Sequence, residues 1–332
     1  MRPTAIDVCA GAGGLSLGLQ RAGFDVLGVE HDLAAVVTHR AYAGPCDLAD
    51  VSAWHPTGSA DLVAGGVPCQ PFSTQGKRLG LRENVGPLFS ATPEPRAQLF
   101  RHLIRIAGEA NASAVLLENV RGLASWDGGA ALAAIREEMV DGGFAHVESR
   151  ILDAADFGTP QHRQRIFVVG FRCQADHARF AWPKPTHGPG RALPWVTVRE
   201  ALELGRAIDV DAPGYTIGTK NNADILVLDR PARTITTSTH DETADPEAPA
   251  RRYGPMLRDA LGATDQWKGS VRLTAEMCAA LQGFPDDWRW PAHVETAHRL
   301  IGNAVPPQLG EAVGGAVLAA MGDVIASMAV AS

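Results

Sequence analysis

The stretch TAIDVCAGAGG, residues 4–14, decides the fold of this chain. A short β-rich run, Thr4–Val8, ends at a glycine-rich turn, and the helical pattern Leu15–Ala22 follows at once. Glycines let the backbone approach a ligand closely, and the first turn of a helix carries N–H groups without partners inside the helix. The stretch therefore predicts a strand, a ligand-binding turn and a helix, the first unit of a parallel α/β sheet.

The ligand class follows from the glycine spacing and from one acidic residue. Glu30 follows the next predicted strand, Asp25–Val29, and stands 17 residues after Gly13. A carboxylate there can accept hydrogen bonds from ribose hydroxyls. The glycines are spaced G-x-G-G rather than G-x-G-x-x-G, which favours an adenosyl ligand over a dinucleotide. A plain tight connection between strand and helix is the alternative for this stretch taken alone.

The same alternation of elements continues to about residue 171. It predicts strands at Asp61–Ala64, Ala114–Leu117, His146–Leu152 and Arg165–Phe171, and helices at Leu99–Ala110 and Ala130–Val140. The predicted fold is α/β, a mostly parallel sheet with helices on both faces.

The composition and the regular pattern of strands and helices change after Cys173. From Trp182 to Gly269 prolines, glycines and isolated charges dominate, with short strand-like pieces at Tyr215–Ile217 and Thr234–Thr237. Helical patterns resume at Thr274–Gln282 and from about Pro307. We predict a discontinuous first domain, residues 1–181 and 271–332, and a smaller irregular domain, residues 182–270.

Composition narrows the class of protein. A chain of 332 residues with 45% hydrophobic residues is globular and large enough for two domains. Its net charge of −7 argues against coating nucleic acid by bulk charge, but residues 151–200 hold seven basic and four acidic side chains, so a local basic surface is possible. Five scattered cysteines without a C-x-x-C pair predict neither a disulfide framework nor a zinc site. With no signal-peptide pattern and no clean membrane span, we expect a cytoplasmic protein without a metal.

A cysteine in a second loop is a candidate nucleophile. Cys69 lies between two prolines in VPCQPF, residues 67–72, and these limit the directions its thiol can take. A lone cysteine is more often an inert, buried residue. Glu118, however, follows the apolar strand Ala114–Leu117, and its carboxylate is expected at the same carboxyl edge of the sheet. Burial there would raise its pKa and suit it to donate a proton.

Two arginines precede the last predicted strand of the first domain. Arg163 and Arg165 are two residues apart, so in an extended segment both point to one face. Paired guanidiniums suit a phosphate, a carboxylate or a base carbonyl. A solvated basic strand start is the alternative, and His162 is predicted to be structural.

Taken together, these motifs resemble those of the DNA (cytosine-5)-methyltransferases. The resemblance covers nearly the whole chain apart from the second domain, and the motifs occur in the family's order. They are Asp7-x-x-x-Gly11-x-Gly13-Gly14, Asp47-Leu48, Pro68-Cys69-Gln70, Glu118-Asn119-Val120, Gln161-x-Arg163-x-Arg165, Arg272-Leu273-Thr274 through Gln282-Gly283-Phe284-Pro285, and Gly302-Asn303-Ala304-Val305.

The resemblance implies a Rossmann-like methyltransferase fold that binds S-adenosylmethionine, releases S-adenosylhomocysteine and needs no metal. It implies a target cytosine flipped out of duplex DNA. Cys69 would add to C6 of that cytosine, Glu118 would hydrogen-bond or protonate N3, and Arg165 would contact O2. Arg163 would brace Glu118 or a phosphate. No residue stands out as the base that removes the C5 proton.

The resemblance also implies two sets of binding residues. For the cofactor these are Asp7, Cys9, Gly11, Gly13, Gly14, Leu15, Glu30, His31, Asp47, Leu48, Gly66, Pro68, Leu99, Asn303 and Ala304. For DNA they are Gln70, Ser73, Gln75, Lys77, Arg78, Gln161, Arg233, Thr234 and Thr236. Cys9 departs from the family, which often has an aromatic residue against the adenine, and the segment from Ser73 to about Pro95 is longer than in compact members.

Double-stranded DNA is the partner that the resemblance implies, with a monomeric enzyme and a possible cognate restriction endonuclease. A tRNA methyltransferase of the same fold is the nearest alternative, since the cytosine chemistry would be shared. The second domain favours DNA, because reading base edges in a groove needs such a module. A catalytically silent DNA-binding relative is disfavoured by the intact Cys69, Glu118 and Arg165, and a nicotinamide-dependent oxidoreductase by the glycine spacing.

Overall fold

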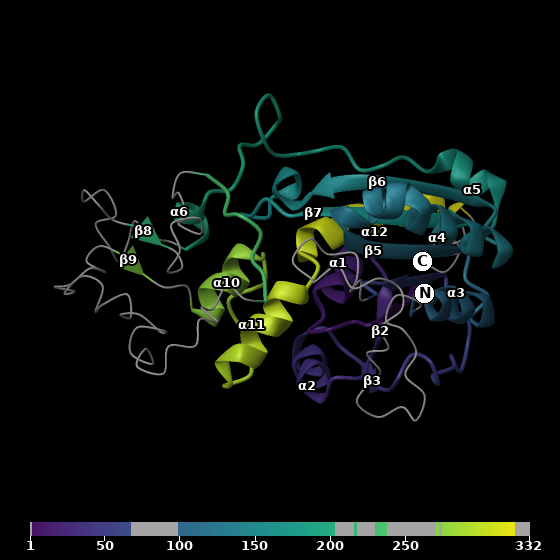
Figure 1. The fold of residues 1–332 in the computed structure, drawn as a ribbon, viewed down its shortest axis with the longest axis horizontal. Helices are drawn as coiled ribbons and strands as arrows, with labels where there is room; N and C mark the ends of the chain where they lie inside the picture. Colours follow the sequence, from purple (N-terminus) through teal and green to yellow (C-terminus); the bar gives the residue numbers. More distant parts are fainter. Residues whose placement is uncertain are drawn as a thin grey trace. The chain divides into compact units, whose positions relative to one another are not determined.

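The structure is a computed structural model that describes residues 2–67, 99–202, 230–237 and 274–322, together with the short strands at 216–217 and 270–271. A mixed seven-stranded sheet is its centre, in the order β3-β2-β1-β4-β5-β7-β6 (Figure 1). From β3 to β5 neighbouring strands are parallel, whereas β7 runs antiparallel to β5. The strands are β1 Thr4–Val8, β2 Asp25–Glu30, β3 Cys46–Leu48, β4 Leu62–Gly65, β5 Ala114–Val120, β6 His146–Asp153 and β7 Gln164–Phe171.

One face of this sheet packs against the helices α3 (Leu99–Glu109) and α4 (Ala130–Asp141). Alternate strand residues such as Val63, Val115 and Val168 belong to one buried apolar cluster with side chains from both helices. Within α3, Leu103, Ile106 and Ala107 are buried at three- and four-residue spacing, which gives the helix one apolar stripe.

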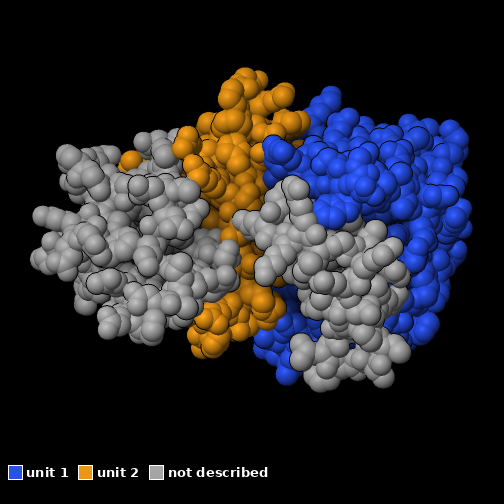
Figure 2. All heavy atoms as spheres, viewed as in Figure 1, with its two compact units in different colours: residues 1–152, 164–184, 309–332 blue, residues 153–163, 185–308 orange. Residues whose placement is uncertain are grey.

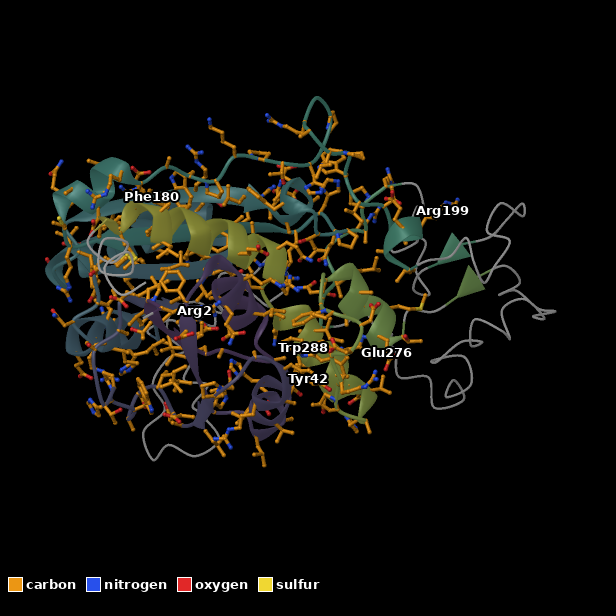
Figure 3. The ribbon with its side chains drawn as sticks, turned by 180° about the vertical axis from the view of Figure 1, so that it is seen from behind. Arg2, Tyr42, Phe180, Arg199, Glu276 and Trp288 are labelled. Atoms are coloured by element: carbon orange, nitrogen blue, oxygen red, sulfur yellow. The ribbon has the colours of Figure 1, made fainter. Side chains whose placement is uncertain are left out.

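The helices α1 (Gly14–Ala22) and α12 (Pro307–Ala320) pack against each other. Glycine permits the close approach, because a Cβ added to Gly314 would lie 2.8 Å from Cδ2 of Leu19, and one added to Gly310 would lie 3.3 Å from Cδ1 of Leu15. Seen from the two sides in Figures 1 and 3, α12 covers the sheet face opposite to α4. The helix that follows the first turn is thus held by a segment far along the chain.

The chain divides into two compact units, coloured in Figure 2. Unit 1 comprises residues 1–152, 164–184 and 309–332, and unit 2 comprises residues 153–163 and 185–308. Residues 271–308, which we predicted in the first domain, therefore group with unit 2, as do residues 153–163. Unit 2 contains η3 (Ala154–Phe157), α6 (Val198–Ala201), the strand pair β8 (Thr216–Ile217) and β9 (Ser270–Val271), α10 (Ala275–Leu281) and α11 (Val294–Asn303). The remaining elements of unit 1 are α2 (Leu33–Tyr42), η2 (Arg121–Gly129) and α5 (Gln174–Arg179).

The predicted α/β fold with a mostly parallel sheet is confirmed, and six predicted strands are present with starts within one residue. Several elements were not predicted, namely the strands β3 and β9, the helices α2, α5, α6 and α11, and the short helices η2 and η3. The strand-like piece expected at Thr234–Thr237 is not a strand; its neighbour Ala232 makes a single bridge to Gln161. Within the described part of the chain, no helix is long and apolar enough to span a membrane.

Candidate functional site

The glycine turn after β1 adopts a strained, internally bonded conformation. Gly11 and Gly13 have φ of 56° and 95°, and Cys9 takes φ 56° although it has a side chain. The N–H of Gly11 donates to the Glu30 carboxylate at 2.9 Å and that of Gly13 to the carbonyl of Ala10 at 3.0 Å. These bonds fix the loop before any ligand is bound.

Glu30, the predicted ribose acid, ends β2 and is 6% exposed. Its Oε1 accepts from the N–H groups of His31 and Asp32 at 2.8 and 2.9 Å, and Oε2 accepts from Gly11. Burial raises the pKa of Glu30, but the hydrogen bonds from His31, Asp32 and Gly11 outweigh burial and leave the pKa below its ordinary value. The group is therefore an ionised acceptor at neutral pH, fixed to the glycine turn.

A buried chain of polar side chains lies beneath this turn. Ser16 Oγ is 2.6 Å from Asp7 Oδ2 and 2.8 Å from His39 Nε2, and His39 Nδ1 is 3.2 Å from the carbonyl oxygen of Gly44. Burial raises the pKa of Asp7 to about 7, although the hydrogen bond with Ser16 lowers it in part. Burial likewise lowers the pKa of His39.

The direction of these hydrogen bonds sets the protonation state. The Gly44 carbonyl can only accept, so a neutral His39 carries its proton on Nδ1 and accepts at Nε2. In one arrangement Ser16 gives its single proton to His39, and Asp7 then donates to Ser16, which requires a protonated carboxyl. The alternative is an ionised Asp7 with a protonated His39. In that alternative Ser16 donates to Asp7 Oδ2 and His39 donates to Ser16. Burial, which raises the pKa of Asp7 and lowers that of His39, favours the first arrangement, in which both groups are neutral.

The residues around the turn fit an adenosyl ligand. Asp7 Oδ1 is buried without a hydrogen-bond partner among the described residues, so one acceptor of this carboxyl is unsatisfied. Leu48 ends β3 with 49% of its surface exposed, which suits a flat aromatic base. Asp47 beside it accepts a 3.0 Å hydrogen bond from Trp54 Nε1. Asp7, Glu30, Asp47 and Leu48 are thus all at or next to the carboxyl ends of β1, β2 and β3, as the prediction requires.

A nearly buried ion pair joins two neighbouring strands. Glu118 on β5 and Arg165 on β7 approach to 3.0 Å, with 9% and 12% of their side chains exposed. Arg165 is opposite Val120 in the antiparallel register, so it is a diagonal neighbour of Glu118 on the same face. Glu118 was predicted to follow the strand; it is instead part of it, because β5 extends to Val120.

The segment that follows β4 leads toward the strand that carries Glu118. Gly65, the last residue of β4, is opposite Leu117, and the Asn119 amide donates to the carbonyl of Val67 at 3.5 Å. Cys69 comes two residues later in the sequence. Cys69 itself lies outside the described residues, as do Pro68, Gln70, Ser73, Gln75, Lys77 and Arg78.

Arg163 and Gln161, predicted to take part in catalysis and DNA contact, are both buried. Arg163 is 2% exposed, and its terminal nitrogens donate to the carbonyls of Ile235 at 2.8 Å and Gly302 at 2.7 Å within unit 2. Arg163 precedes β7, whereas Arg165 is part of it. Gln161, predicted to contact DNA, is fully buried and bonds Leu281, Gln282 and Ile235.

The other predicted residues fall into exposed and buried groups. Arg233, Thr234 and Asn303 are exposed, whereas Ala304 is buried. Leu15 is 3% exposed and packs near Gly310, so it supports the turn from below. Sequence reasoning missed Ser16 and His39, whose polar side chains are buried in a hydrogen-bond network. Nothing in their spacing separates them from surface polar residues.

Comparisons with known proteins agree with this arrangement. Residues 4–319 match the model of the C-5 cytosine-specific DNA methylase family. The Type II methyltransferase M.NgoMIV of Neisseria gonorrhoeae is 33% identical, over 97% of this chain and 99% of the relative. The Type II methyltransferase M.PspPI of Psychrobacter is also 33% identical, over 94% and 78%.

Solved structures show the same fold at lower identity. The Schizosaccharomyces pombe Dnmt2 methyltransferase superposes with a TM-score of 0.60 at 17% identity, over 96% of this chain and 98% of that chain. The Entamoeba histolytica methyltransferase EhMeth superposes with a TM-score of 0.62 at 14% identity and the same coverage.

Proposed function

Since this chain belongs to the C-5 cytosine-specific DNA methylases and is a DNA cytosine methyltransferase, we propose that it methylates C5 of a cytosine flipped out of a specific duplex sequence. Cys69 is the proposed nucleophile, and Glu118 and Arg165 the groups that hold the base. The observation that carries this proposal is the Glu118–Arg165 pair, 3.0 Å apart and nearly buried on adjacent strands.

The residues of the chain act on the cytosine ring in turn. The Cys69 thiolate forms a bond to C6, and the electrons of the C5–C6 double bond move toward N3 and O2. Glu118 hydrogen-bonds or protonates N3, and Arg165 donates to O2, so the charge that develops on the ring is stabilised. The electron-rich C5 would then take the methyl group that S-adenosylmethionine supplies. Loss of the C5 proton to a base and departure of Cys69 from C6, with any proton on N3 returned to Glu118, then restore the aromatic ring.

The cofactor is proposed to bind at the glycine turn. S-adenosylmethionine, when bound, supplies an electrophilic methyl group on a sulfonium sulfur. Glu30 would accept from the ribose hydroxyls, Leu48 would contact the adenine, and Asp7 would lie beneath the turn. Because Glu30 already binds Gly11, the carboxylate that orients the ribose also fixes the turn.

The assignment of partners is part of the proposal. Duplex DNA fits a chain whose relatives are named Type II methyltransferases, and a cognate endonuclease would accompany such an enzyme. We assign cofactor binding and catalysis to unit 1, and target reading to the stretch 182–270 that contains Arg233 and Thr234.

Substitution of the nucleophile tests the proposed mechanism. Cys69→Ala is expected to abolish methyl transfer to plasmid DNA while retaining binding of S-adenosylhomocysteine, because the thiol takes part in chemistry and not in cofactor binding. Cys173→Ala, at an exposed cysteine of unit 1, is the matched control and should keep full activity. Methyl transfer by the Cys69 variant would contradict the mechanism.

Two further measurements define the substrate. Duplexes with 5-fluorocytosine at the target should trap a covalent adduct with the wild-type protein, since fluorine at C5 cannot leave as a proton does. Bisulfite sequencing of a plasmid from cells that express the protein would give the recognition sequence. Methylation of tRNA without methylation of plasmid DNA would show that tRNA, and not DNA, is the substrate.

A further inference from the structure

Gln161 and Arg163, assigned to DNA contact and catalysis from the sequence, are buried within unit 2. We propose that they form a clamp that fixes residues 230–237, which makes Arg163 a positioning residue for target recognition. The proposal rests on the function above, because it names what orients the DNA-reading segment.

Five hydrogen bonds connect the two segments. The N–H of Ala232 donates to the carbonyl of Pro160 at 2.9 Å, and the N–H of His162 donates to the carbonyl of Ala232 at 2.8 Å. The Thr234 hydroxyl donates to the carbonyl of His162 at 2.8 Å. Side chains complete the set, because Gln161 accepts from the Ile235 N–H at 2.7 Å and Arg163 donates to the Ile235 carbonyl at 2.8 Å.

This bonding takes the place of a strand ladder. Ala232 and Ile235 are 1% and 2% exposed, so both ends of the segment are anchored inside unit 2. Between these anchors, Arg233 and Thr234 are exposed. The clamp therefore presents two polar side chains from a backbone that is fixed on either side of them.

The second partner of Arg163 explains how a buried cation is tolerated. Gly302 is in the last turn of α11, where carbonyls lack partners inside the helix and the helix dipole is negative. The guanidinium donates to Ile235 and Gly302 from two different terminal nitrogens held in one plane, a geometry that the single terminal nitrogen of a lysine does not reproduce.

Close packing at Gly302 supports the same contact independently. A Cβ added there would lie 2.5 Å from the backbone carbon of Thr236 and 2.5 Å from the nitrogen of Thr237. Residues 235–237 thus lie directly against the end of α11. Asn303 and Ala304, predicted to bind the cofactor, follow at once, and the carbonyl of Ala304 accepts from Gln282 at 2.6 Å.

Arg163→Lys tests the clamp in the full-length enzyme. We expect about a tenfold rise in KM for cognate duplex DNA, with kcat little changed, because a lysine can replace only one of the two charged hydrogen bonds. Deep bisulfite sequencing of plasmid methylated in vitro should show new sites that differ from the cognate sequence by one base pair. Hydrogen exchange at residues 232–235 should become faster.

Arg172→Lys is the matched control. The Arg172 guanidinium also bonds backbone carbonyls, of Ala112 and Ala107, but in unit 1. This variant should lose thermal stability. Its site spectrum, the set of DNA sequences that it methylates, and its hydrogen exchange at residues 232–235 should both be those of the wild type. If Arg163→Lys does not fold, Ala232→Pro removes the donor to Pro160 from the other side and should give the same relaxed spectrum.

The outcomes separate this inference from the proposed function. A folded Arg163→Lys enzyme with unchanged exchange, KM and site spectrum would overturn the clamp. A lower kcat at unchanged KM would show that Arg163 acts in catalysis, and it would also overturn the clamp. A wild-type protein that methylates no DNA would contradict the proposed function, and hydrogen exchange would still decide whether Arg163 fixes residues 230–237.

Discussion

Glu118 and Arg165 are the residues whose chemistry the structure constrains most closely. Their 3.0 Å approach at 9% and 12% exposure holds a carboxylate and a guanidinium side by side, and we propose that both contact the target base. We expect Glu118→Gln to lower kcat by about a hundredfold or more, since an amide cannot give a proton to N3. Single-turnover methyl transfer measures this. Glu148→Gln is the control, because Glu148 is a carboxylate on β6 that bonds the side chains of His177 and Trp182. Equal rates for the two variants would contradict the assignment of Glu118.

Asp7 gives a prediction on pH. Its pKa is about 7 in the folded protein against 3.8 ordinarily, so the folded state holds a proton that the unfolded state releases between these values. The free energy of unfolding should therefore fall as pH rises from about 4 to about 7. Asp7→Asn removes this loss and keeps a donor to Ser16. Its stability relative to wild type should increase across that window, by at most roughly 4 kcal/mol, and stay constant above it.

Urea unfolding at a series of pH values checks this prediction. Asp25→Asn is the control, because Asp25 is exposed and its ion pair with Arg2 is 3.8 Å long. A stability difference between Asp7→Asn and wild type that does not change with pH would show that Asp7 is ionised throughout.

At the scale of elements, the end of α11 packs against residues 236 and 237 only because residue 302 is a glycine without a side chain. Gly302→Ala would place a methyl group 2.5 Å from the backbone of residues 236 and 237, which cannot rotate away. We expect a loss of about 1–3 kcal/mol in thermal unfolding, as for other overpacked sites. Gly315→Ala on α12 is the control, since nothing lies within 4 Å of its added Cβ. That variant should be neutral or slightly more stable because alanine favours helix. Equal stability of both variants would contradict the close packing.

The sequence predicts strands better than it predicts the elements between them. Buried strands such as β5 contain a continuous apolar run, here Ala114–Leu117, which is typical of a strand buried on both faces. α2 was missed because Leu33 and Val37 are 62% exposed while Val36 and His39 are buried, so apolar residues occur on both faces. β3 has three residues, too few for a period. The antiparallel direction of β7 depends on pairing with β5 and leaves no local signal.

The positions of candidate site residues in the fold could be predicted where a family motif coincides with the end of a strand. Glu30 and Glu118 are where the sequence places them, within a residue or two. Arg163 shows the limit of this reasoning, because alternation predicts a shared face with Arg165 only if both belong to one strand. β7 begins at Gln164, so Arg163 precedes the strand and turns into unit 2. Buried partners such as Ile235, distant in sequence, cannot be found from spacing.

For the whole molecule, charge predicts how DNA binding responds to salt. The net charge is −7, yet residues 61–100 hold four basic and three acidic side chains, and residues 151–200 hold seven and four. If about four phosphates are neutralised, affinity for duplex DNA should fall roughly a hundredfold between 50 and 200 mM salt. Fluorescence anisotropy measures this. Lys184→Ala should reduce the salt slope by about one, whereas Arg2→Ala should not change it, and a flat response would contradict a basic DNA surface.

The packing of α12 on α1 also determines when unit 1 can mature during synthesis. The ribosome must complete residues 185–308 before it makes the segment that fits Gly314 against Leu19. Until then the helix behind the glycine turn lacks one of its packing partners, so a nascent chain would hold an unfinished cofactor turn. The order of segments along the chain thereby delays methylation until unit 2 has also been made.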